Sequence, residues 1–223
     1  MSTEPSLAST QLRHIVAEKV RAAILANEFK PGEWLRQEQL AQQFGVSQTP
    51  VREALQDLVG EGVVERVPYR GIRVIEFTLA DLMDLYACRA FMEGLAARYA
   101  ARHITPQDLA ELRQLVNQMA DAFSRQEWSD YRELNRRFHR VIYAASQRPF
   151  LIRTLDQLWT VYPTMMLSGF ADPIRERRAL NTREHRAIIA ALHARAAARA
   201  ERLMRQHIAE SARRIQARLR ATK

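Results

Sequence analysis

The chain has 223 residues, 47% of them hydrophobic and 26% charged, a composition that is ordinary for a globular protein and excludes a wholly disordered or collagen-like chain. Its formal net charge is +9, but residues 1–76 hold 9 basic against 10 acidic side chains, so if that segment binds DNA, a local basic cluster rather than the bulk charge must support the binding. No stretch approaches the ~20 apolar residues of a membrane span, and the single cysteine, Cys88, excludes an internal disulfide and suits a reducing cytoplasm.

The first part of the chain alternates short helical patterns with breaks. Residues 1–10 are polar and are expected to form a loose tail. Apolar residues then recur at helical spacing over 11–27, which predicts an amphipathic helix. Pro31 and Gly32 break the chain, and a short helix is expected over 37–44.

A tight turn and a third helix follow. Gly45 supplies the turn, and Ser47 or Thr49 can cap a helix whose Pro50 lies in the first turn, where its missing N–H costs little. Two runs rich in Val and Ile then flank a Pro-Tyr-Arg-Gly segment at 68–71. This pattern predicts a small β-hairpin.

From residue 78 onward the apolar pattern is helical to the end and predicts six helices without strands. The helices are expected near 79–102, 106–125, 127–146, 149–168, 172–195 and 197–220. Prolines at 106, 149 and 173 mark breaks between them. The fold is therefore expected to be mainly α, with an N-terminal domain over 1–76 and a six-helix bundle over 77–223.

A helix, a tight turn, a second helix and a β-hairpin in this order predict a winged helix-turn-helix, whose second helix enters the major groove of DNA. Short polar groups at the start of that helix can contact phosphates, and Gln or Arg can read base edges. The candidates are Ser47, Gln48, Thr49 and Arg52 on the helix, and Arg66, Arg70, Gly71 and Arg73 on the hairpin. The alternative is that Ser47, Thr49 and Pro50 only begin a helix and that Arg52 is solvated.

Four segments carry a family resemblance: LRQEQLA at 35–41, GVSQTPVREAL at 45–55, GVV at 62–64 and Arg-Gly at 70–71. They resemble the GntR family of bacterial transcription regulators, and the six helices resemble the effector domain of its FadR-like subfamily. The resemblance implies a homodimer on an inverted-repeat operator in double-stranded DNA, controlled by a small metabolite in the helical domain. By position it implies DNA contacts by Arg36, Ser47, Thr49, Arg52 and Gly71. Gln48 departs from the arginine that the family often has there, which favours adenine over guanine at that step.

Three histidines lie on the apolar sides of their predicted helices: His139, His185 and His207. Asn135 stands one turn before the first of them. Three imidazoles and an amide oxygen can converge on one metal ion in a helical bundle. A lone inward histidine is more often a hydrogen-bonded core residue, and a polar network that binds an organic ligand directly is the alternative.

The subfamily resemblance sharpens the metal hypothesis. Its metal-binding members have Asp or Asn, then His four residues later, then one His on each of the last two long helices. All four positions match in order, although Asn135 replaces the more frequent Asp and is a weaker ligand. Imidazole nitrogens favour Zn²⁺ or Ni²⁺.

Arg89 lies on an apolar helical stripe, so its guanidinium is expected inside the bundle, where it needs a partner. The partner is either Glu93, one turn later, or the carboxylate of a metabolite. The resemblance implies a small carboxylate effector. Residues that suit the wall of its pocket, and equally the core or an interface, are Tyr86, Arg140, Tyr143, Trp159 and Tyr162.

These observations predict a DNA-binding transcriptional regulator, a repressor rather than an activator, and not an enzyme. A metal-dependent hydrolase built on the bundle is the alternative. However, no His-Glu-x-x-His pattern is present, and Glu184 is expected on a different face from His185. A scaffold that binds a partner through its Arg-rich final helices does not account for the DNA-reading segment.

Overall fold

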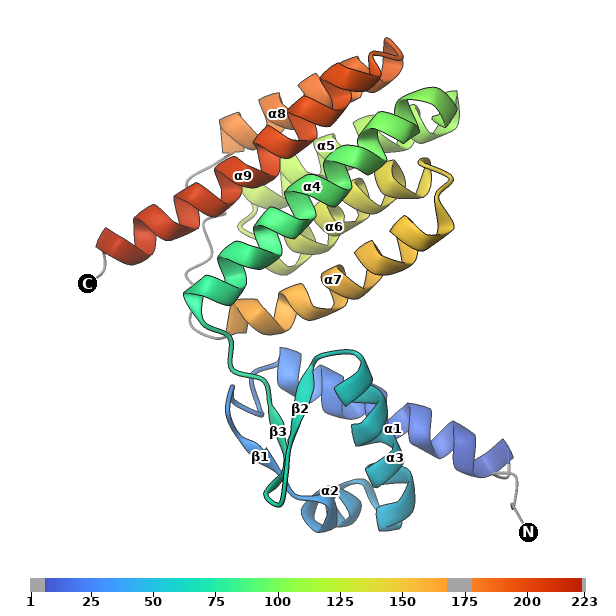
Figure 1. Cartoon of the computed structure of the whole chain (residues 1–223), viewed down its shortest axis with the longest axis vertical. Helices are drawn as coiled ribbons and strands as arrows, with labels where there is room; N and C mark the ends of the chain where they lie inside the picture. The colour runs from blue at the N-terminus through green and yellow to red at the C-terminus, as the bar shows by residue number, and fades with distance from the viewer. Residues whose placement is uncertain (1–6, 168–177, 222–223) are drawn as a thin grey trace. The chain divides into compact units, whose positions relative to one another are not determined.

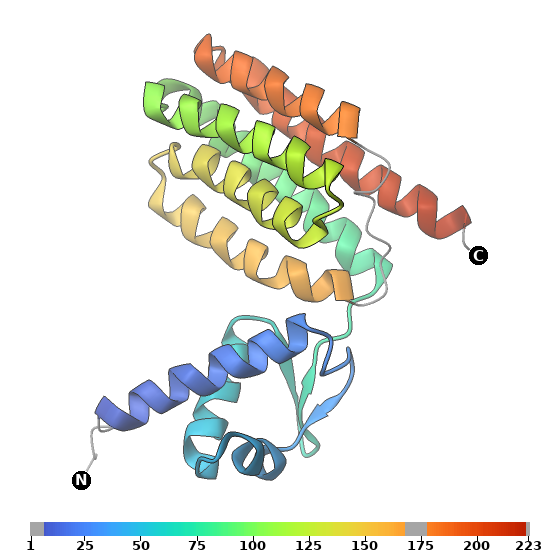
Figure 2. The ribbon, with the colours of Figure 1, turned by 180° about the vertical axis from the view of Figure 1, so that it is seen from behind.

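The computed structural model describes residues 7–167 and 178–221, which form nine helices and three strands. The described residues form two compact units, one of residues 7–78 with 160–167 and one of residues 79–159 with 178–221. The mainly helical fold class predicted from the sequence is confirmed (Figure 1; Figure 2). None of the described helices is long and apolar enough to cross a membrane.

The first unit combines three helices with a small antiparallel sheet of order β1-β3-β2. Its elements are α1 (Leu7–Leu25), β1 (Trp34–Leu35), α2 (Gln37–Phe44), α3 (Gln48–Gly60), β2 (Val64–Val67) and β3 (Gly71–Val74). Two expectations are corrected. Residues 7–10 belong to α1 rather than to a loose tail, because Leu7 and Ala8 are good helix formers. Strand β1 was not predicted, since two residues carry no periodic signal, and it pairs with Ile72 and Arg73 of β3.

The turn between α2 and α3 is set by Gly45. Its φ of 68° lies in the left-handed region, which glycine enters without steric penalty. The amide N–H of Val46 then donates to the carbonyl of Ala41 at 3.0 Å and closes the end of α2. As a result α3 starts immediately after the turn, with Val51, Leu55 and Leu58 fully buried in the core of this unit.

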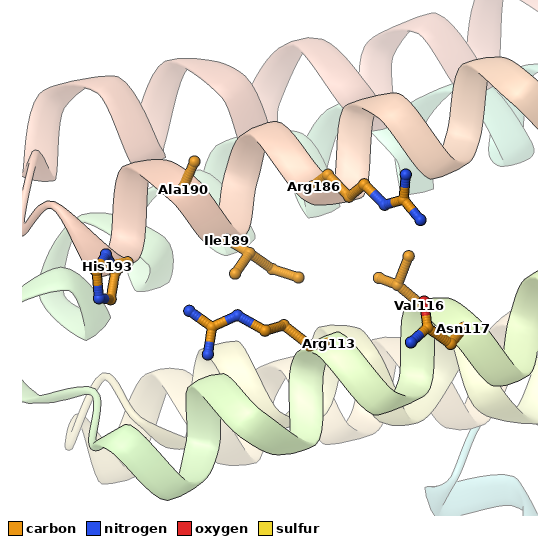
Figure 3. Close-up of a pocket in the computed structure, with 7 residues that line it drawn as sticks. All are labelled: Arg113, Val116, Asn117, Arg186, Ile189, Ala190 and His193. Atoms are coloured by element: carbon orange, nitrogen blue, oxygen red, sulfur yellow. The ribbon is translucent and has the colours of Figure 1, made fainter.

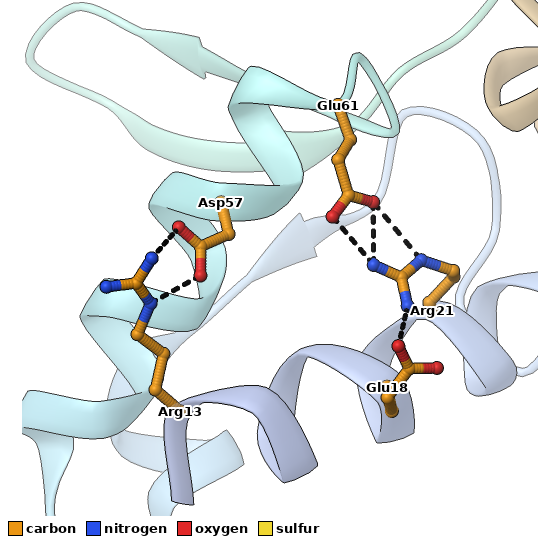
Figure 4. A network of polar contacts seen from close by, with 5 residues as sticks. All are labelled: Arg13, Glu18, Arg21, Asp57 and Glu61. Carbon is orange, nitrogen blue, oxygen red and sulfur yellow. Dashed lines mark hydrogen bonds and ion pairs between the residues drawn. The ribbon is translucent and has the colours of Figure 1, made fainter. Parts of the chain in front are cut away.

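Two arginines of α1 hold the second half of α3 (Figure 4). The Nε and Nη2 atoms of Arg13 donate to the two carboxylate oxygens of Asp57 at 2.5 and 2.6 Å. Arg21 donates to both oxygens of Glu61, from Nη2 at 2.7 Å, and from Nη1 to Glu18 at 2.5 Å. Burial works against the charged guanidinium, but the hydrogen bonds with Glu61 and Glu18 outweigh it and raise the pKa of Arg21. These contacts fix α3 to α1.

The two acidic partners of Arg21 should contribute unequally to stability. The pair with Glu61 is bidentate and three-quarters shielded on the arginine side, whereas Glu18 is 75% exposed. We expect Arg21→Met to lower the free energy of unfolding by about 1 kcal/mol, because partly shielded bidentate pairs lie at the upper end of surface ion pairs. Glu18→Gln should have no measurable effect. Urea unfolding of both variants measures the two changes in the free energy of unfolding. Equal losses would contradict the unequal contributions of Glu61 and Glu18.

The second unit is an all-helical bundle. Its helices are α4 (Leu79–His103), α5 (Pro106–Ser124), α6 (Trp128–Ala144), α7 (Pro149–Leu167), α8 (Arg178–His193) and α9 (Ala197–Ala221). Of α7, the part up to Trp159 belongs to this unit, and the part from Thr160 is grouped with the first. The predicted start of α5 is confirmed by a capping box, in which Thr105 and Asp108 satisfy each other's backbone N–H groups. The part of the predicted 172–195 helix that precedes residue 178 lies outside the described residues.

Helices α4 and α9 run side by side in this bundle, and α8 packs on both α9 and α5 (Figure 1; Figure 2). Small side chains allow the close approach of α4: Ala96, Ala97 and Ala100 are fully buried. At Gly94 an added Cβ would meet the side chain of Arg205 on α9 at 2.4 Å. Helix α6 packs on α4 and α5, so α4, α6, α8 and α9 surround one interior.

Candidate functional site

The start of α3 presents a set of polar side chains to solvent. Ser47 is the N-cap residue, and its side chain makes no capping hydrogen bond. The residues Ser47, Gln48, Thr49 and Arg52 are all exposed, as predicted for DNA contacts, and Arg36 is exposed at the N-cap of α2. Pro50 and Val51 between them are buried and anchor the helix. The free N–H groups of this helix start and the positive end of its dipole favour a phosphate.

The β2–β3 hairpin is the wing of this unit. Arg66, Arg70 and Gly71 are exposed, and Gly71 adopts a φ of 116° that side chains disfavour. Arg73, also a candidate for DNA contact, donates from Nε to Glu65 on the neighbouring strand at 2.6 Å. Tyr69, which no sequence pattern singled out, has the most exposed large hydrophobic side chain of the described residues.

In the helical unit the structure brings together the three predicted histidines. His139 comes from α6, His185 from α8 and His207 from α9, and all three are buried. One ligating atom from each lies within 4.8 Å of the others, which is close enough for a single ion.

Two carboxylates hold the rings of this cluster. The Nδ1 of His139 lies 2.5 Å from Oε2 of Glu93, and the Nδ1 of His207 lies 2.7 Å from Oε2 of Glu184. An ionised carboxylate only accepts hydrogen bonds, so each Nδ1 donates to its carboxylate, and Nε2 is the nitrogen that can bind a ligand when the ring is neutral. Carboxylate–histidine pairs of this kind orient the imidazoles of metal sites. The donor set therefore fits a divalent ion.

Glu93 stays charged although it is buried. Burial alone would raise its pKa, but the charge of Arg89, then the charge of His139, and hydrogen bonds to both lower it to about 2. Arg89 donates from Nε to Oε1 of Glu93 at 2.8 Å, and its guanidinium lies 3.8 Å above the ring of Trp159. An Arg89–Glu93–His139 chain thus links α4 to the cluster. Two partners were predicted for Arg89, Glu93 and the carboxylate of a metabolite, and the structure shows the contact with Glu93.

The other predicted pocket residues lie at different depths. Asn135 is half-buried one helical turn before His139, and Tyr86 is buried 5.4 Å from the guanidinium of Arg89. Arg140 does not face the cluster: its side chain is 64% exposed and its Nε lies 3.4 Å from Oδ1 of Asp156. The side chain of Tyr162 lies outside the described residues.

Tyr143 is a buried neighbour of that ion pair. Its hydroxyl donates to Oδ1 of Asp156 at 2.6 Å. Burial, and then this hydrogen bond, raise the pKa of Tyr143 well above its ordinary range. The hydroxyl is therefore a hydrogen-bond donor that joins α6 to α7 and stays protonated at neutral pH.

A groove of about 460 Å³ lies elsewhere on this unit, between α5 and α8. It is lined by Arg113, Val116, Asn117, Arg186, Ile189, Ala190 and His193. In Figure 3 the guanidinium of Arg113 is turned toward His193 and that of Arg186 away from it, above Val116 and Asn117. All four polar side chains are exposed. They do not converge on one point, as the polar groups of a specific ligand site do.

The contacts of both carboxylates with the histidine rings were not predicted. The sequence predicts Glu93 only as a partner of Arg89, from its position one helical turn later. Glu184 was expected away from His185, but its ring partner is His207, which is 23 residues later and on another helix. No sequence pattern marks that pairing.

Two family models match the chain. Bacterial regulatory proteins of the gntR family match residues 12–74, and the FCD domain matches residues 84–210. The regulator McbR of Escherichia coli is 36% identical over 130 residues, which are 58% of this chain and 59% of that protein. The solved structure of E. coli McbR/YncC has a TM-score of 0.72 at 25% identity, with coverage of 93% of this chain and 98% of that one.

Two further E. coli relatives align over more of the chain. The uncharacterized HTH-type transcriptional regulator YieP is 30% identical over 197 residues, 78% of this chain and 84% of that protein. The transcriptional repressor RspR is 29% identical over 211 residues, 94% of this chain and 92% of that protein.

Proposed function

Because the chain belongs to the gntR family of bacterial regulatory proteins and carries an FCD domain, we propose that it is a FadR-like transcriptional repressor whose operator binding is controlled by a small carboxylate. The family and the relatives are transcriptional regulators, not enzymes. RspR is named a transcriptional repressor, which supports repression rather than activation.

DNA binding is assigned to the start of α3 and to the wing. Ser47, Thr49 and Arg36 would bind phosphates and set the register, while Gln48 and Arg52 would read base edges in the major groove. The support is the exposure of these side chains around the free start of a helix that α1 and the core hold in place. Arg70 and Gly71 would contact the DNA backbone from the wing.

We expect the operator to be an inverted repeat. One α3 helix covers a short half-site, and a homodimer places two such helices in successive major grooves about 34 Å apart. Dimerisation also brings two basic wings to the same duplex, which strengthens binding through phosphate neutralisation. The homodimer is part of the proposal.

The observation that carries the effector site is the buried triad of His139, His185 and His207, with Glu93 and Glu184 behind two of its rings. These histidines would hold Zn²⁺ or Ni²⁺, with the amide oxygen of Asn135 as a fourth ligand. The ion would supply positive charge and open positions for a carboxylate. Arg89, tied to Glu93, would sense that carboxylate and relay its presence along α4, the helix that begins at Leu79 just after the first unit.

The contacts of the histidine triad do not favour a hydrolase. A hydrolase needs a free acidic residue as general base beside the metal-bound water. The two carboxylates beside the triad, Glu93 and Glu184, are instead hydrogen-bonded to Nδ1 atoms of its histidines.

Selection of duplexes from sheared genomic DNA by the purified protein, at low and at high salt, tests the proposed function. We expect a short inverted repeat that survives high salt, because base contacts do not depend on counterion release as phosphate contacts do. The candidate acids would be named by the genes beside the strongest sites. Binding that vanishes with salt and shows no shared sequence would contradict the proposal.

By linkage, an acid that weakens operator binding by some factor must itself bind the operator complex more weakly by the same factor. Titration of the acid with and without operator checks this. If the two factors differ, the loss of operator affinity does not come from binding of the acid to this site.

A further inference from the structure

The carboxylate behind His207 has a second partner, which lies on α9. Oε2 of Glu184 is 2.7 Å from Nδ1 of His207, and its other oxygen, Oε1, is 3.3 Å from Nη2 of Arg214. Arg214 follows His207 by seven residues, or about two helical turns, so both side chains lie on the same side of α9. The three side chains form an Arg214–Glu184–His207 chain of contacts beside the histidine triad.

The same order of side chains occurs at a second histidine of the triad. Arg89 donates to Oε1 of Glu93, and Oε2 of Glu93 contacts Nδ1 of His139. In both chains of contacts one carboxylate oxygen contacts an imidazole and the other contacts an arginine. Arg89 and Glu93 share one helix, whereas Arg214 comes from α9 and Glu184 from α8. The repetition at two members of one triad favours a common role for the two arginines.

The contact between Arg214 and Glu184 is partly shielded from solvent. Their side chains are 27% and 25% exposed, whereas that of the neighbouring Arg213, which pairs with Glu210 at 2.8 Å, is 65% exposed. Nη1 of Arg214 is buried and has no hydrogen-bond partner among the described residues. Because a buried donor without a partner is unfavourable, this guanidinium should add little to the stability of the metal-free protein.

The position of Glu184 bears on two of the three histidines. It accepts from His207 on α9, and it directly precedes His185 on α8. The ring centroids of His185 and His207 are 4.6 Å apart. A carboxylate that is fixed from α9 therefore helps to keep these two rings in register, and a metal ion tolerates only small displacements of its ligands.

We propose that Arg214 is a positioning residue of the histidine triad: it holds the Glu184 carboxylate, which in turn orients the His207 ring for its ligand. The inference rests on the proposed function and adds a residue that acts on the ion only through Glu184. Without the guanidinium, Glu184 keeps its charge but can turn toward solvent. The ring of His207 then loses its acceptor and samples other orientations.

The sign of the effect on zinc affinity separates positioning from charge. A guanidinium repels a nearby cation, so if Arg214 acted through its charge alone, removing it would strengthen zinc binding. If it positions Glu184, removing it weakens zinc binding. We expect Arg214→Met to lower the zinc affinity of the full chain about ten-fold, measured by competition with a chelator. An unchanged or higher affinity would overturn the inference.

Two further variants test the path of action. In a protein that already carries Glu184→Gln, Arg214→Met should cause no further loss of zinc affinity, because the two changes interrupt the same chain of contacts. Additive losses would show that Arg214 acts by another route. Arg213→Met is the matched control: it removes the same charge from the next position of α9 and should leave the zinc affinity nearly unchanged.

A readout without metal separates this inference from the proposed function. In the metal-free protein the Nδ1 proton of His207 should give a protected resonance in nitrogen–proton correlation spectra of the histidines, since it is hydrogen-bonded to Glu184. Arg214→Met should broaden or remove this resonance, and Arg213→Met should not. Circular dichroism checks that each variant is folded, and Arg214→Gln replaces Arg214→Met if the latter is not.

The outcomes are distinct. If the unchanged protein binds no zinc but the resonance depends on Arg214, the metal site of the proposed function fails and the positioning role is supported. If zinc binds, and neither its affinity nor the resonance depends on Arg214, the inference alone is overturned.

Discussion

Replacing His139 and His207 together with alanine is expected to abolish stoichiometric zinc binding. The unchanged protein should retain about one Zn²⁺ per chain after dialysis, and the double variant less than a tenth of that, because one imidazole and one amide cannot hold the ion. Zinc at about 1,000 times its Kd should raise the melting temperature of the unchanged protein by about 10 °C and that of the variant not at all. Elemental analysis and thermal unfolding measure the two effects.

A matched control is His193→Ala. His193 is an exposed histidine on the same helix as His185 but outside the triad, so its loss should change neither zinc content nor the thermal shift. Circular dichroism without metal checks that the double variant is folded. A folded double variant with one bound zinc would rule out the site.

The carboxylate behind His207 gives a finer test of the same centre. In Glu184→Gln the amide oxygen can still accept from Nδ1, so the ring keeps its place, but the charge that increases the basicity of the imidazole is gone. Zinc affinity should fall about ten-fold with little change in the stability of the metal-free protein.

Acidification should also release the ion, because a ligating imidazole must be neutral. Glu93 contributes nothing to such a transition near neutral pH: its pKa is lowered to about 2, so it remains charged there and its stabilising contribution is lost only as pH falls toward that value.

The second large effect is expected at the start of α3. Arg52→Ala should weaken specific operator binding about 100-fold, because each half-site of a dimer loses a base-edge contact. Arg199→Ala, which removes the same charge from an exposed position on α9, should leave affinity at matched salt nearly unchanged. Fluorescence anisotropy with the selected duplex measures both. Equal losses in the two variants would mean that Arg52 acts only through charge.

Gln48→Arg should change specificity rather than remove binding. Gln pairs best with adenine and Arg with guanine, so one symmetric position of the operator should switch preference from A·T to G·C. Repeating the duplex selection with the variant reads this directly. An unchanged motif would show that Gln48 does not contact a base edge.

The sequence by itself determined the elements and the side chains within each of them. Helical spacing, Gly45 and the Thr105-Pro106 start predicted the helix-turn-helix and the bundle, because periodicity, turn residues and caps act over a few neighbours. The same spacing put three histidines on the inward faces of their helices, and the order of elements predicted that α3 is the helix that reads DNA.

Only the tertiary structure decided which of these side chains meet. The convergence of His139, His185 and His207 within 4.8 Å depends on how far each helix is shifted and rotated against its neighbours. The same packing brought Glu184 to His207 and left Arg140 in solvent. Packing angles arise from side chains far apart in the chain, so no local pattern encodes them.

At the tip of the wing, too, the sequence determined the element and the folded structure determined its conformation. The sequence predicted a turn at 68–71, but the φ of 61° at Tyr69 and its full exposure are properties of the folded hairpin. The register that pairs Val67 with Gly71 leaves only three residues to reverse the chain, and Pro68 fixes the first of them, so the left-handed conformation falls on the tyrosine.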